Sequence, residues 1–265
     1  MRVKLLSLAA VCTLALAATA VADVVYMPTP TNLPAGWSTV VKPDSSGRGS
    51  ISVKIGSYGL PFSFQFTNGD KDKTARCWSA LTTDIFDNIR VSQITALNIT
   101  VVGIEGDGSS WSPPHFVFAL KKAPTNLSNR FIEWIPWEDG TPREPQQVRT
   151  YDALVDGRWY CPWVGGYYST LAAFVAAYPD ATFATASEIQ TMLSGFSGKS
   201  FSVGYADWVT EVQKYNDSAR GLVSQFEVGI DGVTTTYLLG VPEPGSLLAL
   251  VTGLVGLAGV IRRRR

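Results

Sequence analysis

Residues 226–238 read FEVGIDGVTTTYL, and this stretch indicates the fold class. Phe226, Val228 and Ile230 occupy every second position, which is the period of a strand with one buried face. Asp231-Gly232 fits a two-residue hairpin turn, in which both central residues need a positive φ. Residues 233–238 can then return as the partner strand, so the stretch predicts a β-hairpin.

The same alternation recurs through the rest of residues 23–240. Apolar residues at every second position predict further strands within residues 51–55, 62–66, 97–101 and 116–120. Asn68-Gly69 indicates a second hairpin turn. Many short strands separated by turns predict a mainly β domain, folded as an antiparallel β-sandwich.

One or two short helices are expected within this domain. Ser169 or Thr170 can cap a helix that ends before Pro179. Thr185 and Glu188 have the spacing of a capping box and can open a second helix.

The charge balance separates the domain from the two ends of the chain. The chain has 22 basic and 22 acidic residues. Six of the basic residues but only one acidic residue lie in residues 1–22 and 241–265, so residues 23–240 carry 16 basic and 21 acidic residues, a net charge of −5. An acidic domain argues against a nucleic-acid-binding surface, which needs clustered Lys and Arg.

The first 22 residues have the parts of a secretory signal peptide. Arg2 and Lys4 form a charged start, and residues 5–19 form an apolar run too short to span a membrane. Ala20-Val21-Ala22 provides small residues at the positions that a signal peptidase requires, which predicts cleavage before Asp23.

The last 25 residues predict a membrane anchor. Val241-Pro242-Glu243-Pro244 is followed by an uncharged apolar run, residues 245–261, and then by Arg262, Arg263, Arg264 and Arg265. At about 1.5 Å per residue, the run just spans a bilayer core as a single transmembrane helix. Because basic residues stay on the cytoplasmic side, the domain is expected outside the cytoplasmic membrane.

This ordered series of motif, apolar run and arginine cluster resembles the PEP-CTERM sorting tail of exported proteins in Gram-negative bacteria that make extracellular polysaccharide. The same tail type is also named after the C-terminus of an ice-binding protein. The resemblance implies an exosortase as processing partner, which would cut near Pro242-Glu243-Pro244 and leave the protein at the cell surface or outside the cell. The alternative is a plain membrane anchor.

A second resemblance concerns the domain. Residues 178–181, Tyr-Pro-Asp-Ala, and the later stretch 226–237 resemble the end of jelly-roll domains of bacterial surface proteins. Such domains are similar in outline to carbohydrate-binding modules. The resemblance implies a jelly-roll-like sandwich, from which a helical segment near residues 185–195 departs.

Cysteine usage predicts one disulfide. Cys12 leaves with the leader, so Cys77 and Cys161 remain in an oxidising compartment. The alternative is two free, buried thiols.

Candidates for chemistry are few. His115 is the only histidine, which excludes a multi-histidine metal site, and no nucleophile elbow or phosphate-binding loop occurs. Glu133, Glu138 and Asp139 lie beside tryptophans, as in sugar clefts, but a solvated acidic loop accounts for them better. We therefore expect no enzyme activity, no cofactor and no metal.

Aromatic residues crowd between positions 134 and 168. Aromatic faces stack on sugar rings, so Trp134, Trp137, Trp163 and Tyr167 are candidate glycan-binding residues. Large aromatic residues also fill cores, and this alternative stays open. The sequence thus favours a non-catalytic surface or matrix protein that binds extracellular polysaccharide, with a secreted polysaccharide hydrolase or lyase as the alternative.

Overall fold

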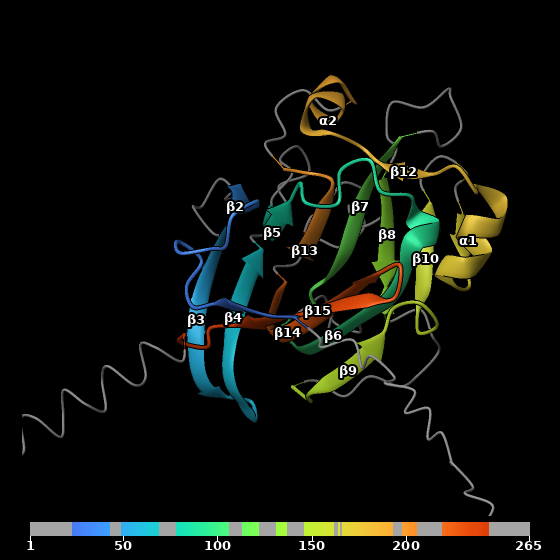
Figure 1. The fold of residues 1–265 in the computed structure, drawn as a ribbon. Helices are drawn as coiled ribbons and strands as arrows, with labels where there is room; N and C mark the ends of the chain where they lie inside the picture. Colours follow the sequence, from blue (N-terminus) through green and yellow to red (C-terminus); the bar gives the residue numbers. More distant parts are fainter. Residues whose placement is uncertain are drawn as a thin grey trace, which may run out of the picture.

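The computed structural model describes residues 23–42, 49–68, 78–105, 113–121, 131–136, 146–161, 164, 166–192, 198–205 and 219–243. Over these residues the chain is mainly β, with two sheets and few helices, an arrangement consistent with the predicted β-sandwich (Figure 1). The predicted leader and residues 244–265 of the predicted tail lie outside them. No helix in the described ranges is long and apolar enough to cross a membrane.

One sheet has seven strands in the order β1-β15-β14-β4-β3, with β6 and β9 added on the other side of β14. Its strands are β1 (Asp23–Met27), β3 (Gly49–Ser57), β4 (Leu60–Asn68), β6 (Ile94–Glu105), β9 (Arg149–Asp152), β14 (Arg220–Ile230) and β15 (Val233–Leu239).

The other sheet has eight strands in the order β11-β10-β8-β7-β13-β5-β2, with β12 beside β7. Its strands are β2 (Trp37–Lys42), β5 (Trp78–Thr83), β7 (His115–Lys121), β8 (Phe131–Ile135), β10 (Arg158–Cys161), β11 (Gly166–Tyr168), β12 (Thr182–Phe183) and β13 (Phe201–Tyr205).

The strands predicted from alternation are confirmed. Each predicted range lies within one strand, and these strands are β3, β4, β6, β7, β14 and β15. The predicted hairpin turn joins β14 to β15, with φ of 49° at Asp231 and 83° at Gly232. A bulky residue at either position would be strained in this left-handed backbone conformation, which Asp and Gly adopt more readily.

The hairpin turn predicted at Asn68-Gly69 lies partly outside the described residues, since Gly69 is not among them. Within the described residues, β4 belongs to the seven-stranded sheet and the strand that follows it, β5, to the eight-stranded one. The hairpin partner of β4 is β3, through a turn at Tyr58-Gly59 that carries no Asn-Gly or Asp-Gly signal. The ladders are antiparallel except between β1 and β15, which pair in parallel, with Met27 opposite Leu239.

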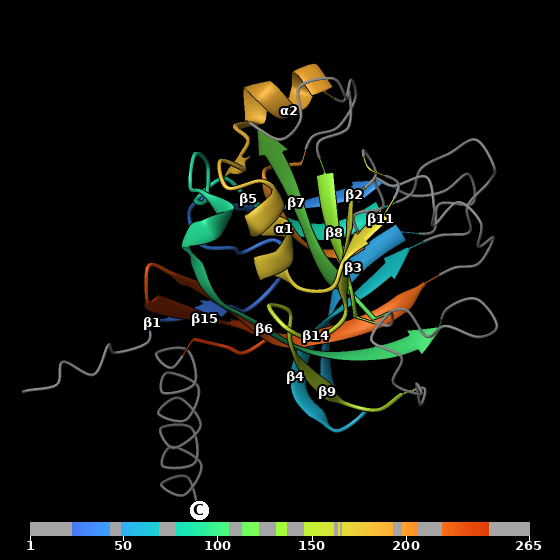
Figure 2. The same ribbon diagram turned by 90° about the vertical axis from the view of Figure 1, so that its right-hand side faces the viewer.

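Both predicted helices are present. Helix α1 (Leu171–Ala177) is capped by Thr170, whose hydroxyl accepts a hydrogen bond from the Ala173 amide at 3.1 Å. Helix α2 (Ala186–Met192) begins with the predicted capping box, in which the Thr185 amide donates to the Glu188 carboxylate at 2.8 Å. Figure 2 shows α2 beyond the upper end of β7. A 3₁₀ turn, η1 (Val91–Gln93), precedes β6.

The core lies between the two sheets and is strongly aromatic. Phe201 of β13 is at its centre, with ring centroids 4.8 Å from Phe86, 5.3 Å from Phe118 and 5.6 Å from Phe116. Phe226, from the opposite sheet, is 6.5 Å away and stacks on Tyr237. These contacts join the layers, since apolar area buried between sheets is the main stabilising term.

The predicted Cys77–Cys161 disulfide is not formed. Cys161 ends β10 as a free, buried cysteine. Cys77 lies outside the described residues, but its neighbour Trp78 begins β5, four strands from β10 in the same sheet. At about 4.8 Å per strand, Cys161 and the start of β5 are separated by about 19 Å. A disulfide needs Cα atoms within about 7 Å.

We expect the Cys161 thiol to be unreactive in the folded protein. Its side chain is fully buried, and burial raises the pKa of the thiol because the thiolate is poorly solvated. Ellman titration with peptide mapping should find Cys161 unlabelled in native protein and labelled after denaturation without reductant. Recovery of a non-reduced peptide that holds Cys161 in a disulfide would contradict this.

Candidate functional site

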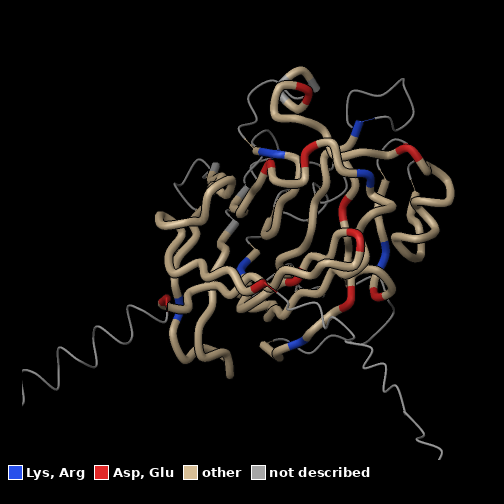
Figure 3. The backbone as a smooth tube through the Cα atoms, in the orientation of Figure 1, with Lys and Arg blue, Asp and Glu red and all other residues tan. Residues whose placement is uncertain are grey.

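The described charged residues do not gather on one face. Figure 3 shows Lys and Arg interspersed with Asp and Glu along the backbone. A candidate site is therefore sought among buried polar groups and exposed aromatic residues.

Buried polar residues gather on the outer face of the eight-stranded sheet, the face turned away from the core. Alternation sends Phe116 and Phe118 of β7 into the core, so His115 and Val117 point outward. One row of directly paired residues crosses this face, and it runs through Ser202, Val117, Glu133, Tyr160 and Tyr167. We call this set, together with His115, the outer row.

His115 and Glu133 form a buried pair in the outer row. His115 Nε2 lies 2.6 Å from Glu133 Oε1, and the two side chains are 5% and 1% exposed. This separation is within ion-pair distance, and the imidazole is charged only if it is protonated. The second carboxylate oxygen, Oε2, has no hydrogen-bond partner within the described part of the chain.

The other ring nitrogen of His115 contacts the backbone. Its Nδ1 is 3.3 Å from the Pro113 carbonyl oxygen, which can only accept a hydrogen bond, so this contact requires a hydrogen on Nδ1. The ring thereby presents Nε2 to Glu133 Oε1.

Aromatic residues occupy the other end of the outer row. The rings of Tyr160 and Tyr167 are 5.0 Å apart, and Tyr167, on edge strand β11, is 39% exposed. An exposed ring supported by a buried one is a stacking surface for a flat apolar face, such as that of a sugar.

Trp134 is wrong as a glycan-binding candidate. It points into the core with no exposed surface, and its Nε1 donates to the Asp156 carbonyl at 2.7 Å. Alternation along β8 explains this, because Trp134 and Glu133 must face opposite sides. Trp137 and Trp163 lie outside the described residues. Tyr167 stays a candidate.

The pairing of His115 with Glu133 was missed by sequence reasoning. Glu133 was considered only beside Glu138 and Asp139, and His115 only as a strand-end histidine. A signal was present, since Glu133 is the single charged residue in an otherwise apolar run, residues 131–135. A lone acid in a fully buried strand requires a partner.

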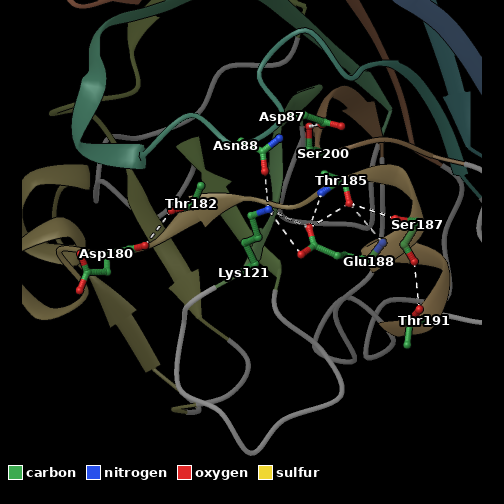
Figure 4. Close-up of polar contacts among 10 residues, drawn as sticks. All are labelled: Asp87, Asn88, Lys121, Asp180, Thr182, Thr185, Ser187, Glu188, Thr191 and Ser200. Atoms are coloured by element: carbon green, nitrogen blue, oxygen red, sulfur yellow. Dashed lines mark hydrogen bonds and ion pairs between the residues drawn. The ribbon is translucent and has the colours of Figure 1, made fainter.

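A second polar cluster lies where α2 meets the sheets (Figure 4). Lys121, at the end of β7, donates to Asn88 and forms an ion pair with Glu188 at 3.1 Å. Burial alone would raise the pKa of the Glu188 carboxyl, but hydrogen bonds from Thr185 and the charge of Lys121 outweigh it and hold that pKa below its ordinary value. Each charge is satisfied within the cluster, which fastens α2 to the sandwich.

The described residues contain no cluster of side chains that could bind a metal ion. No three His, Cys, Asp or Glu residues among them come together. Asp84 is paired with Lys199 at 3.0 Å, and Asp87 accepts a hydrogen bond from Ser200 at 2.6 Å.

Comparison with known proteins adds no relative, since the chain matches no protein-family model, no curated protein and no solved structure. The outer row is therefore chosen as the candidate site from its geometry alone.

Proposed function

We propose that this chain is an exported protein of a Gram-negative bacterium, that its tail anchors it in the cytoplasmic membrane until an exosortase processes it, and that it then acts at the cell surface. The observation that carries the proposal is the order of Pro242-Glu243-Pro244, apolar run and arginine cluster at the end of the chain. Support comes also from the position of the motif. The last strand ends at Leu239, and Glu243 is exposed, so an enzyme can reach the motif without unfolding the sheet.

We expect the surface form to lack the residues that follow the motif. Removal of the apolar run and the arginine cluster shortens the chain by about 20 residues, because an exosortase would cut near Pro242-Glu243-Pro244. Intact-mass measurement of protein extracted from the cell surface checks this. A C-terminus at Arg265 would leave a plain anchor in place of sorting.

We further infer that the sandwich is jelly-roll-like and binds extracellular polysaccharide without cleaving it. The exposed Tyr167 ring above Tyr160 supports this, because stacking on sugar faces needs an accessible aromatic surface. Affinity is expected to be weak, since each hydrogen bond to a sugar replaces one to water.

Tyr167→Ala is expected to reduce retardation of the protein in gels that contain the bound polysaccharide, with little loss of stability. Affinity electrophoresis over a panel of neutral and acidic polysaccharides measures this. Tyr58→Ala is the matched control, because Tyr58 is 40% exposed and lies in the turn between β3 and β4 of the seven-stranded sheet. Equal retardation of wild type and both variants would remove Tyr167 from the site, and no retardation of wild type would contradict polysaccharide binding.

The second candidate function is a polysaccharide hydrolase or lyase, and the His115–Glu133 pair favours it. A buried imidazole beside a carboxyl group can supply an acid or a base for proton transfer. A glycosidase needs a second carboxyl, about 5–9.5 Å from the first, and Glu133 is the only acid in the outer row. Release of reducing ends or unsaturated products by wild type, lost in Glu133→Gln, would establish this function instead.

A further inference from the structure

The turn at the tip of the β3–β4 hairpin is built from an unexpected residue. Tyr58 and Gly59 are its two central residues, with φ of 52° and 83°. Both positions of such a turn require positive φ, for which Asn-Gly is the usual pair. A bulky tyrosine rarely adopts this backbone, and an outlier of this kind points to a use for the side chain outside folding.

Tyr58 belongs to a small exposed apolar surface, which we call the tip patch. Its members are Ile55, Tyr58 and Val148, which are 72%, 40% and 42% exposed. Val148 joins the tip because its Cγ2 lies 3.7 Å from the position that a Cβ on Gly59 would occupy. Figures 1 and 2 show the hairpin and the start of β9, which follows Val148, at the lower end of the molecule.

The tip patch lies near the point where the tail leaves the fold. Leu239 is fully buried, and the Gly240 amide donates to the Met27 carbonyl at 2.8 Å. A Cβ on Gly240 would lie 3.0 Å from the Ser63 carbonyl oxygen, so the chain leaves directly against β4. From Ser63 to the tip is five residues, about 16 Å along the strand.

The predicted membrane segment cannot begin far from this point. Residues 240–244 separate Leu239 from the apolar run that starts at Gly245. Fully extended, this connection reaches about 20 Å. While the tail spans the membrane, the end of the sandwich that holds Gly240 must therefore lie close to the lipid surface.

We propose that the tip patch contacts the lipid headgroup layer of the membrane while the tail is anchored there. Tyrosine suits this layer because its ring is apolar and its hydroxyl remains hydrated, and Ile55 and Val148 add apolar area. This inference rests on the proposed tail anchor. Two contacts, the tail and the tip patch, then fix the orientation of the sandwich on the bilayer.

The test uses the chain from Asp23 to Arg265, reconstituted in phosphatidylethanolamine and phosphatidylglycerol vesicles. A Cys77→Ser background with buried Cys161 permits single labelling of Ile55→Cys with an environment-sensitive fluorophore. Ile85→Cys is the matched control, since Ile85 is 43% exposed and follows β5, a strand that lies in the upper half of Figures 1 and 2, away from the β3–β4 hairpin turn. Doxyl-labelled lipids should quench the label at position 55 and leave the label at position 85 bright.

A second variant separates contact from folding. Tyr58→Asn places a better turn residue at positive φ, so the fold should be retained while quenching at position 55 decreases. Protein that floats with vesicles but shows equal quenching at positions 55 and 85 would overturn the tip contact and keep the anchor. Protein that does not float with vesicles would overturn the anchor, and the tip contact with it.

Discussion

Trp134→Ala is expected to lower the free energy of unfolding by about 3–5 kcal/mol, the usual cost of truncating a core tryptophan. Its ring is fully buried, with centroids 5.7 Å from Phe116 and 5.5 Å from Tyr151. The substitution also leaves the Asp156 carbonyl without its 2.7 Å hydrogen bond from Nε1. Because the surrounding sheets relax only partly, a cavity remains where the indole was.

Urea denaturation followed by far-ultraviolet circular dichroism measures this loss without relying on tryptophan fluorescence. Tyr167→Ala is the control, and it should cost less than about 1 kcal/mol, because Tyr167 is 39% exposed. A Trp134→Ala protein of normal stability that no longer binds polysaccharide would return Trp134 to the list of glycan-binding residues.

His115→Ala is expected to cost about 3–5 kcal/mol, since it leaves the buried Glu133 side chain without its partner. Replacing both residues, in His115→Leu with Glu133→Leu, should recover most of the stability, as apolar pairs often substitute for buried ion pairs.

A double-mutant cycle over the two single variants and the double variant isolates the coupling between His115 and Glu133. The double variant also separates stability from function. If it folds normally but loses polysaccharide binding or cleavage, the pair is retained for that function. A cost below about 1 kcal/mol for His115→Ala would contradict the burial of the pair.

Local patterns predicted local structure well. Phe226, Val228 and Ile230 identified β14, and Asp231-Gly232 identified its hairpin, because strand period and turn geometry depend on residues close together in the chain. Both helix starts were found for the same reason, since Thr170 and Thr185 bond to amides or side chains three residues away.

In strands that are buried on both faces, the alternation of residue types does not show which face points into the core. All residues of β8 are buried, so the sequence around Glu133 and Trp134 is apolar on both sides of the strand. It does not show which of the two side chains faces the core. For this reason the sequence did not show which aromatic residues between positions 134 and 168 lie in the core and which lie on the outer face. The tertiary structure divides them, with Trp134 and Trp159 in the core and Tyr160 and Tyr167 on the outer face.

The sequence alone determined the period of the strands, two helix caps, one hairpin and the ordered motifs at the ends of the chain. The tertiary structure alone decided that β4 and β5 belong to different sheets, that β1 pairs in parallel with β15, and that Cys161 lies far from the start of β5. It also decided that His115 meets Glu133. The physical reason is range: caps and turns are short-range contacts, whereas strand pairing joins residues distant in the chain and is selected by how two whole sheets bury their faces.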